Sequence, residues 1–210
     1  MEPRKLIPIL FLVIVLSMTA VIAFFPPNGD FRAENPFWNG LSTFNSELKA
    51  ASLDSLGDLP SDPNGTSLVV IPYVEFNVPD LESLKSFVSL GGTLVVLDDY
   101  GYGNQILNHL GLNVSFTGDP LSDPLFDYRS KWLPKITDFA ASPIARNVSS
   151  VVFNHATVLN SNSEVDVLAH SSRFSLVDLN DNSVLDANEA AGPLPVVALV
   201  NVGNKDCDLI

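Results

Sequence analysis

The sequence predicts an α/β fold: an open, mostly parallel sheet flanked by helices. Two apolar runs, 68–73 and 93–97, are rich in Val, Leu and Ile, which is typical of strands buried on both faces. An amphipathic segment and a Gly-Gly pair separate these runs, which indicates a strand–helix–strand unit with parallel strands. A helical piece at 105–110 continues the alternation, so we expect a sheet of the flavodoxin-like kind.

Residues 1–25 are predicted to be a membrane anchor. Arg4 and Lys5 precede 20 residues without charge, 6–25, and a helix of that length spans about 30 Å, the thickness of a bilayer core. The positive-inside rule then places the N-terminus in the cytoplasm and the main domain outside. A cleaved signal peptide is the alternative, although no small-x-small cleavage site is evident. We expect a single-pass protein of the cell membrane that binds the bilayer through residues 6–25.

The rest of the chain is predicted to be a linker, 26–34, followed by an extracytoplasmic α/β domain, 35–210. Asn35-Pro36 provides a helix start. Large apolar residues then fall on one helical face: Phe37, Leu41, Phe44 and Leu48. This pattern predicts a helix that packs on the sheet, and residues 52–66, rich in Ser, Asp, Gly and Pro, a loop.

The second half of the chain is predicted to contain short strands and one long loop. Residues 114–116 are a candidate third strand, and 117–145, with several prolines and scattered aromatic residues, predict an irregular loop over one end of the sheet. Further segments have strand composition: 151–153, 157–159, 165–169, 174–177 and 195–202.

Charge and cysteine content exclude several classes of function. The formal net charge is −13, and residues 1–25 carry a net +1, so residues 26–210 carry −14. A domain this acidic is not expected to bind nucleic acid, although it suits the binding of cations. The only cysteine, Cys207, lies near the end of the chain, which excludes a disulfide framework and a cysteine-based metal cluster.

The segment 178–189 has the spacing of a calcium-binding loop. Oxygen-bearing side chains stand at positions 1, 3, 5, 9 and 12 of a twelve-residue stretch, and position 7 would contribute a backbone carbonyl. The predicted ligands are Asp178, Asn180, Asn182, Val184, Asp186 and Glu189. Ser183 replaces the usual glycine at position 6, and strand-like flanks argue against a helix–loop–helix. We expect a calcium loop between two strands; the alternative is a polar turn without an ion.

A second candidate site lies at the predicted carboxyl end of the sheet, where open α/β domains bind ligands. Its candidate ligand-binding residues are Tyr73, Glu75, Asp98, Asp99, Tyr100 and Asn104. Adjacent carboxylates can perform acid–base catalysis if their pKa values are driven apart. The structural alternative is that Asp98 and Asp99 cap the turn that follows them.

Other polar residues give weaker signals. The histidines, His109, His155 and His170, lie in different predicted elements, so neither a metal trio nor a catalytic triad is expected. Three short triplets have the sequence of N-glycosylation sites, at Asn64, Asn113 and Asn147, and export would make them usable.

Several segments resemble the mostly archaeal, membrane-anchored family labelled domain of unknown function 4350. The similar segments are 35–44, 69–76, 91–107, 123–128, 154–159 and 178–193. The resemblance implies a fold similar to class I glutamine amidotransferase-like domains without their catalytic residues, because Asp98-Asp99-Tyr100 stands where the nucleophilic cysteine would be. It also implies a likeness to extracytoplasmic parts of transport systems. Residues 203–210 do not match, so we expect that the C-terminus is truncated or frame-shifted.

Together these observations predict a membrane-tethered, extracytoplasmic binding or scaffolding module. It would be accessory to a transport system, with a membrane protein of that system as its partner, and would not be an enzyme. The alternative is a hydrolase that uses a carboxylate cleft at Asp98 and Asp99. An enzyme would bring these carboxylates into a concave pocket with a further acid, base or nucleophile, whereas a scaffold would use them to cap turns.

Overall fold

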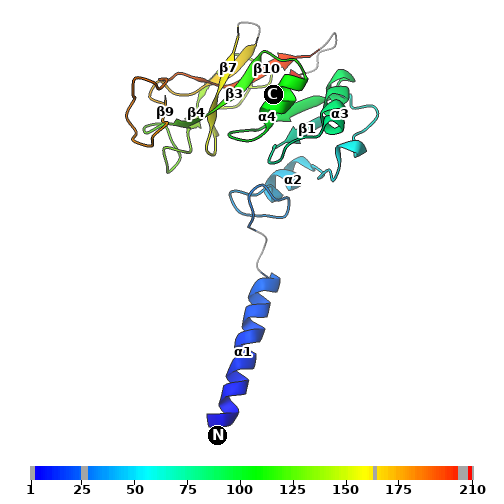
Figure 1. Cartoon of the computed structure of the whole chain (residues 1–210), viewed down its shortest axis with the longest axis vertical. Coiled ribbons are helices and arrows are strands. Elements are labelled where there is room, and N and C mark those ends of the chain that lie inside the picture. The colour runs from blue at the N-terminus through cyan, green and yellow to red at the C-terminus, as the bar shows by residue number, and fades with distance from the viewer. Residues whose placement is uncertain (1–2, 25–27, 163–164, 203–207, 210) are drawn as a thin grey trace. The chain divides into compact units, whose positions relative to one another are not determined.

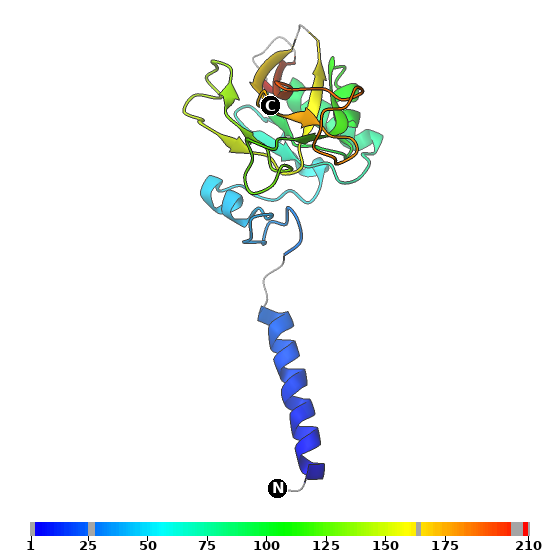
Figure 2. The same cartoon turned by 90° about the vertical axis from the view of Figure 1, so that its left-hand side faces the viewer.

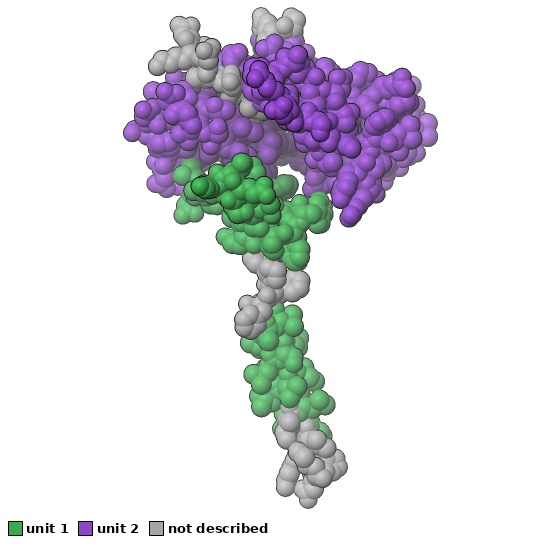
Figure 3. All heavy atoms as spheres, turned by 180° about the vertical axis from the view of Figure 1, so that it is seen from behind, with its two compact units in different colours: residues 1–54 green, residues 55–210 purple. Residues whose placement is uncertain are grey.

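The computed structural model describes residues 3–24, 28–162, 165–202 and 208–209. The chain divides into two compact units, which Figure 3 shows in different colours. Unit 1 comprises Met1–Asp54 and unit 2 comprises Ser55–Ile210. The predicted calcium loop and the paired carboxylates both belong to unit 2.

Unit 1 begins with α1 (Pro3–Phe24), which Figures 1 and 2 show as one continuous helix. Within the described residues, no helix is both long enough and apolar enough to cross a membrane. The predicted anchor at 6–25, the membrane as a partner and the single-pass location in the cell membrane are therefore wrong. The prediction counted only charges, whereas a membrane span requires sustained apolar character.

The second part of unit 1 is a turn built around the buried Asn35, followed by α2 (Ser42–Leu48). Asn35 Oδ1 accepts a hydrogen bond from Phe37 N at 2.8 Å, and Nδ2 donates to Gly29 O at 2.8 Å. The predicted helix over 35–48 is thus wrong in its first half, because Leu41 N and Ser42 N donate to Arg32 O and Asn35 O, farther back than the i−4 carbonyls of a helix. The predicted packing of its apolar face is also wrong, since α2 has no buried residue.

Unit 2 contains the predicted strand–helix–strand unit. Strand β1 (Ser67–Val70) pairs in parallel with β2 (Thr93–Val96), and α3 (Val78–Ser89) connects them. The side chain of Asn77 caps α3 by accepting a hydrogen bond from Asp80 N. The apolar face of α3 enters the main core, where Leu84, Val88 and Leu94 are fully buried. This prediction is confirmed.

The predicted helical piece after β2 is α4 (Gly103–His109), which packs beside α3 through Ile106 and Leu107. A 3-10 turn, η1 (Leu56–Asp58), also contacts α3. The predicted long loop at 117–145 is wrong in part. Strand β3 (Val114–Ser122) continues through it beyond an irregularity between Phe116 and Pro120, and two short strands follow.

The predicted open, mostly parallel, flavodoxin-like sheet is wrong. The largest sheet has the order β1-β2-β11-β10-β8-β5 and is mixed. Among the described pairs, only β1–β2 and β2–β11 are parallel. The later strands pair antiparallel. Their bounds are β5 (Asp138–Phe139), β8 (Asp166–His170), β10 (Pro195–Asn201) and β11 (Asp208–Leu209).

Two smaller antiparallel sheets complete unit 2 and lie toward its β9–β4 end in Figure 1. One has the order β7-β3-β9, with β7 (Thr157–Ser161) and β9 (Leu176–Val177) on either side of β3. The other pairs β4 (Lys135–Ile136) with β6 (Val151–Val152). A second apolar cluster, which includes Leu121 of β3 and Val177 of β9, packs against the three-stranded sheet.

The connections between strands explain why the parallel prediction failed. Parallel neighbours need a crossover of a dozen or more residues, usually a helix, whereas antiparallel neighbours can be joined by turns. In the described part of the chain, no helix follows α4. The prediction extended the strand–helix alternation of residues 68–110 to a half of the chain whose described residues form no helix.

Candidate functional site

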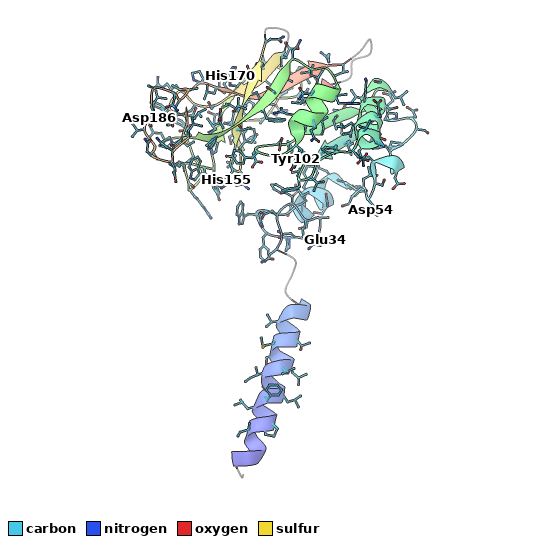
Figure 4. All side chains as sticks on the ribbon, viewed as in Figure 1. Glu34, Asp54, Tyr102, His155, His170 and Asp186 are labelled. Carbon is cyan, nitrogen blue, oxygen red and sulfur yellow. The ribbon has the colours of Figure 1, made fainter. Side chains whose placement is uncertain are left out.

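The segment Asp178–Glu189 forms a polar loop directly after β9, in the part of unit 2 where Figure 4 labels Asp186. We call it the cation loop. Its first residue is fixed from two sides, because Asp178 N donates to Pro120 O of β3 and the Asp178 side chain is fully buried. The loop therefore starts from a rigid point of the three-stranded sheet.

Hydrogen bonds inside the cation loop join the oxygen-bearing residues predicted from sequence. Asn180 Nδ2 and Asn182 Nδ2 donate to the same oxygen, Asp186 Oδ2, at 2.7 and 2.9 Å. The two oxygens of Glu189 accept from Leu179 N and from Asp186 N, at 2.8 and 2.9 Å. The loop thus brings four of its predicted ligands into one network.

The backbone of Ser183 has the conformation that a calcium loop requires at its sixth position. Its φ is +59°, in the left-handed region where glycine usually stands. Ser183 N donates to Asp178 Oδ2 at 3.1 Å, so the buried carboxylate holds the serine in this conformation. The substitution of serine for glycine, which weakened the sequence match, is accommodated by the fold.

Lys131 places its ammonium against the cation loop. Its Nζ atom lies 2.9 Å from Asp178 Oδ2, 2.5 Å from Asp181 Oδ1 and 2.7 Å from Ser183 Oγ. The same atom lies 4.5 Å from the centroid of the Trp132 ring. Sequence reasoning missed Lys131 because it stands 47 residues before Asp178 and has no local motif.

This contact changes the titration of both partners. Burial by itself favours the neutral form of Asp178, but the hydrogen bonds from Lys131 and from Ser183 N outweigh it and lower the pKa of the carboxyl group. Burial also opposes the charge on Lys131, but the bonds to Asp181 and Asp178 outweigh that and raise its pKa. Both groups are therefore charged at neutral pH.

The donor set of the cation loop fits calcium better than a softer metal. In the described residues, no group of three or more His, Cys, Asp or Glu side chains could hold a metal ion. A site in this loop would therefore rely on amide and carbonyl oxygens in addition to carboxylates. Calcium accepts such mixed, hard oxygen donors, whereas zinc prefers nitrogen and sulfur. The predicted ligands are Asp178, Asn180, Asn182, Val184, Asp186 and Glu189, and their three carboxylates do not converge on one point in this structure.

The paired carboxylates at the end of β2 form a turn cap. Asp98 accepts hydrogen bonds from Gly101 N at 2.9 Å and from Gly103 N, at the start of α4, at 2.7 Å. Asp99 Oδ1 accepts from Tyr100 N at 2.7 Å. Burial raises the pKa of Asp98 against the opposing effect of these bonds, while burial and the charge of Asp99 raise the pKa of Tyr100. The geometry matches the structural alternative stated for this pair.

The other residues of this candidate site do not converge on a pocket. Asn104 bonds both backbone groups of Phe116, at 2.8 and 2.9 Å, and so holds α4 to β3. Tyr73 and Glu75 lie exposed on the surface. One hollow of about 360 Å³ lies beside β3 and β7, and another of about 560 Å³ lies beside β5. None of the six predicted residues lines either hollow.

The histidines and the glycosylation triplets are dispersed in unit 2, and Figure 4 labels His155 and His170 in different places. His109 Nε2 lies 3.1 Å from Glu82 Oε1, and His155 stacks on Trp132 with 6.3 Å between ring centroids. The triplet asparagines, Asn64, Asn113 and Asn147, are all exposed, and their modification stays a prediction.

Comparison with known proteins decides the family. The family model described as Domain of unknown function (DUF4350) matches residues 33–205. The chain belongs to the DUF4350 family. Two of the segments on which the resemblance rested, 123–128 and 178–193, are linked through Lys131 in the DUF4350 structure. Asp123 N donates to Lys131 O while the lysine side chain binds Asp178.

A solved structure, the mmIFT52 N-terminal domain, has a similar fold. It matches with a TM-score of 0.56 and 12% sequence identity over 80% of the DUF4350 chain and 75% of that chain. At this identity the likeness concerns the fold alone. No curated protein matches the DUF4350 chain. The amidotransferase-like sheet implied by the resemblance is wrong for this chain, because most of its described strand pairs are antiparallel.

Proposed function

We propose that the DUF4350 chain is a non-catalytic binding module whose cation loop takes calcium. The observation that carries the proposal is that three oxygens of the loop contact a cationic group. Asp178, Asp181 and Ser183 coordinate the Lys131 ammonium, while the backbone at Ser183 has the left-handed conformation typical of calcium loops.

The remaining charge of the loop favours a further cation. Lys131 contacts one oxygen of Asp178 and one of Asp181, and it leaves the carboxylates of Asp186 and Glu189 without a basic partner in the described ion pairs. Within the described residues, the hydrogen bonds that these two side chains accept come from neutral amide groups of the loop. A divalent ion would relieve their mutual repulsion and order the loop.

The hydrolase alternative has weaker support. A catalytic carboxylate needs an oxygen that is open to substrate, and both oxygens of Asp98 accept backbone hydrogen bonds that shape the start of α4. The raised pKa of Asp98 favours an acid role in principle. However, neither hollow described above contains this residue. We therefore favour a binding module over a hydrolase.

A thermal melt of the full chain tests the calcium proposal. Binding to the folded state alone would stabilise the protein by about 2.7 kcal/mol at a hundredfold excess of calcium over Kd, and by less if the site is weak. We expect a higher midpoint in about 5 mM calcium, enough for a weak site, than in chelator, and a smaller effect of magnesium, which demands more regular geometry. Equal midpoints in calcium and chelator would contradict calcium binding.

A further inference from the structure

The edge strand β5 borders a hollow of about 560 Å³ that the cation loop does not share. The hollow lies between β5 and the turns of residues 140–149. Its lining includes Thr137, Phe139, Ala140, Pro143, Ala145 and Arg146. Most of these side chains are small or apolar, so the hollow has room for an apolar side chain of a ligand.

The backbone N–H and C=O groups of Phe139 point away from the sheet at this hollow. Asp138 is opposite His170 and Phe139 is opposite Ala169 in the antiparallel pair, and Ala140 N donates to Leu168 O at 2.8 Å. Because successive residues of an antiparallel strand direct their backbone groups to opposite sides, the N–H and C=O of Phe139 point away from β8. Since β5 ends the six-stranded sheet, no described strand pairs with them.

Arg146 gives the hollow a positive charge without a partner. In the described part of the chain, its guanidinium makes no ion pair, hydrogen bond or ring contact. The other arginines of unit 2 differ, because Arg129 lies over the Tyr128 ring and Arg173 over the Phe174 ring, at 4.9 and 4.6 Å. Among the described residues that line the hollow, none is acidic. The site is therefore complementary to an anion with two oxygens, such as a carboxylate.

We propose that this hollow binds the C-terminal segment of a polypeptide. The segment would add to the β5 edge through the two outward backbone groups of Phe139, and its free carboxylate would pair with Arg146. A C-terminal residue with an apolar side chain fits this site. Its carboxylate would pair with Arg146, and its side chain would pack against Phe139, Pro143 and Val148. The proposal does not depend on calcium, because the cation loop follows β9 in another sheet.

Selection from a library of random hexapeptides with free C-termini tests the proposal on the immobilised full chain. Enriched sequences would be synthesised as free acids and as C-terminal amides, and their binding measured by fluorescence anisotropy. We expect the amide to bind at least about tenfold more weakly than the acid, because it loses a charge-assisted hydrogen-bonded pair. Hydrogen exchange should also slow at the Phe139 amide when the acid binds.

Two variants decide whether Arg146 is the carboxylate partner. Arg146→Gln should bind the acid at least about tenfold more weakly and should no longer distinguish acid from amide. Arg129→Gln, a matched change whose residue does not line the hollow, should bind like the wild type. The proposal is overturned if no sequence is enriched on the wild type relative to Arg146→Gln, if acid and amide bind equally, or if Phe139 exchange is unchanged.

Discussion

The Nζ atom of Lys131 lies 2.9 Å from Oδ2 of Asp178, whose side chain is completely buried. This ion pair connects the chain after β3 to the cation loop after β9. A buried charge that loses its partner is costly, whereas removal of both charges is much less so. The pair therefore makes the position of the cation loop depend on a residue outside it.

Lys131→Met should destabilise the protein by about 3 kcal/mol, because it leaves the Asp178 carboxylate buried and unpaired. Urea unfolding of the full chain measures the change. Lys135→Met is the matched control, since Lys135 is exposed and contributes no described ion pair. The double variant with Asp178→Asn should recover part of the loss. A cost equal to that of Lys135→Met would show that the pair is not stabilising.

The lowered pKa of Asp178 predicts acid sensitivity. Its folded pKa is below the unfolded value of about 4, so the carboxylate stabilises the fold above that value, and this contribution disappears as the pH falls through the folded pKa. The free energy of unfolding should decrease below about pH 4, and Asp178→Asn should reduce that decrease. Urea unfolding between pH 6 and pH 2 gives both curves. Parallel curves for the wild type and the variant would refute the assignment to Asp178.

Glu189→Gln should remove most of the midpoint shift that calcium produces. Glu189 is the twelfth residue of the loop, the position that supplies two oxygens to calcium, and an amide offers only one. Its Oε1 can still accept one of the two backbone hydrogen bonds described for Glu189, so the apo protein should keep its fold. Thermal melts with calcium and with chelator provide the measurement. Glu47→Gln is the control, because Glu47 is an exposed residue of α2, and this variant should keep the full calcium shift. A full shift in Glu189→Gln would show that Glu189 is not a calcium ligand.

Asp98→Ala should cost about 1–3 kcal/mol, because it removes the acceptor of two backbone N–H groups at the start of α4. Asp98→Asn should cost less at neutral pH, since it keeps one acceptor oxygen and removes a charge that burial disfavours. The pH dependence of stability that Asp98 contributes has the opposite sign to that of Asp178. Because the folded pKa of Asp98 is raised, protonation of Asp98 stabilises the folded state as the pH falls. Equal losses in the two variants, measured by urea unfolding, would contradict this account.

Gly40→Ala should disrupt the turn around Asn35 in unit 1. A Cβ at Gly40 would lie 2.1 Å from Asn35 O, which is a backbone atom and cannot rotate away. Faster hydrogen exchange over residues 28–48 is the expected result. Gly57→Ala is the matched control, because its nearest new neighbour is Ser55 Oγ at 3.4 Å. Unchanged exchange in Gly40→Ala would show that the turn tolerates a side chain.

The sequence by itself determined the elements with a strong local signal. The parallel β1–β2 pair, its helix α3 and the following α4 came from apolar periodicity, which reports the burial of each element's own face. The spacing of oxygen-bearing residues singled out the cation loop as a candidate calcium site, because all of these residues lie within twelve consecutive positions, and calcium binding there stays a prediction.

Only the tertiary structure decided how distant segments meet. Lys131 and Asp178 are 47 residues apart, and neither has a local pattern that indicates the other. In the described part of the chain, connections without helices set the direction of the later strands, and backbone bonds from Leu41 and Ser42 to Arg32 and Asn35 replaced the first half of a helix that periodicity predicted. Local patterns measure what a segment favours alone, whereas pairing, capping and ion pairs depend on which partners the rest of the chain brings within reach.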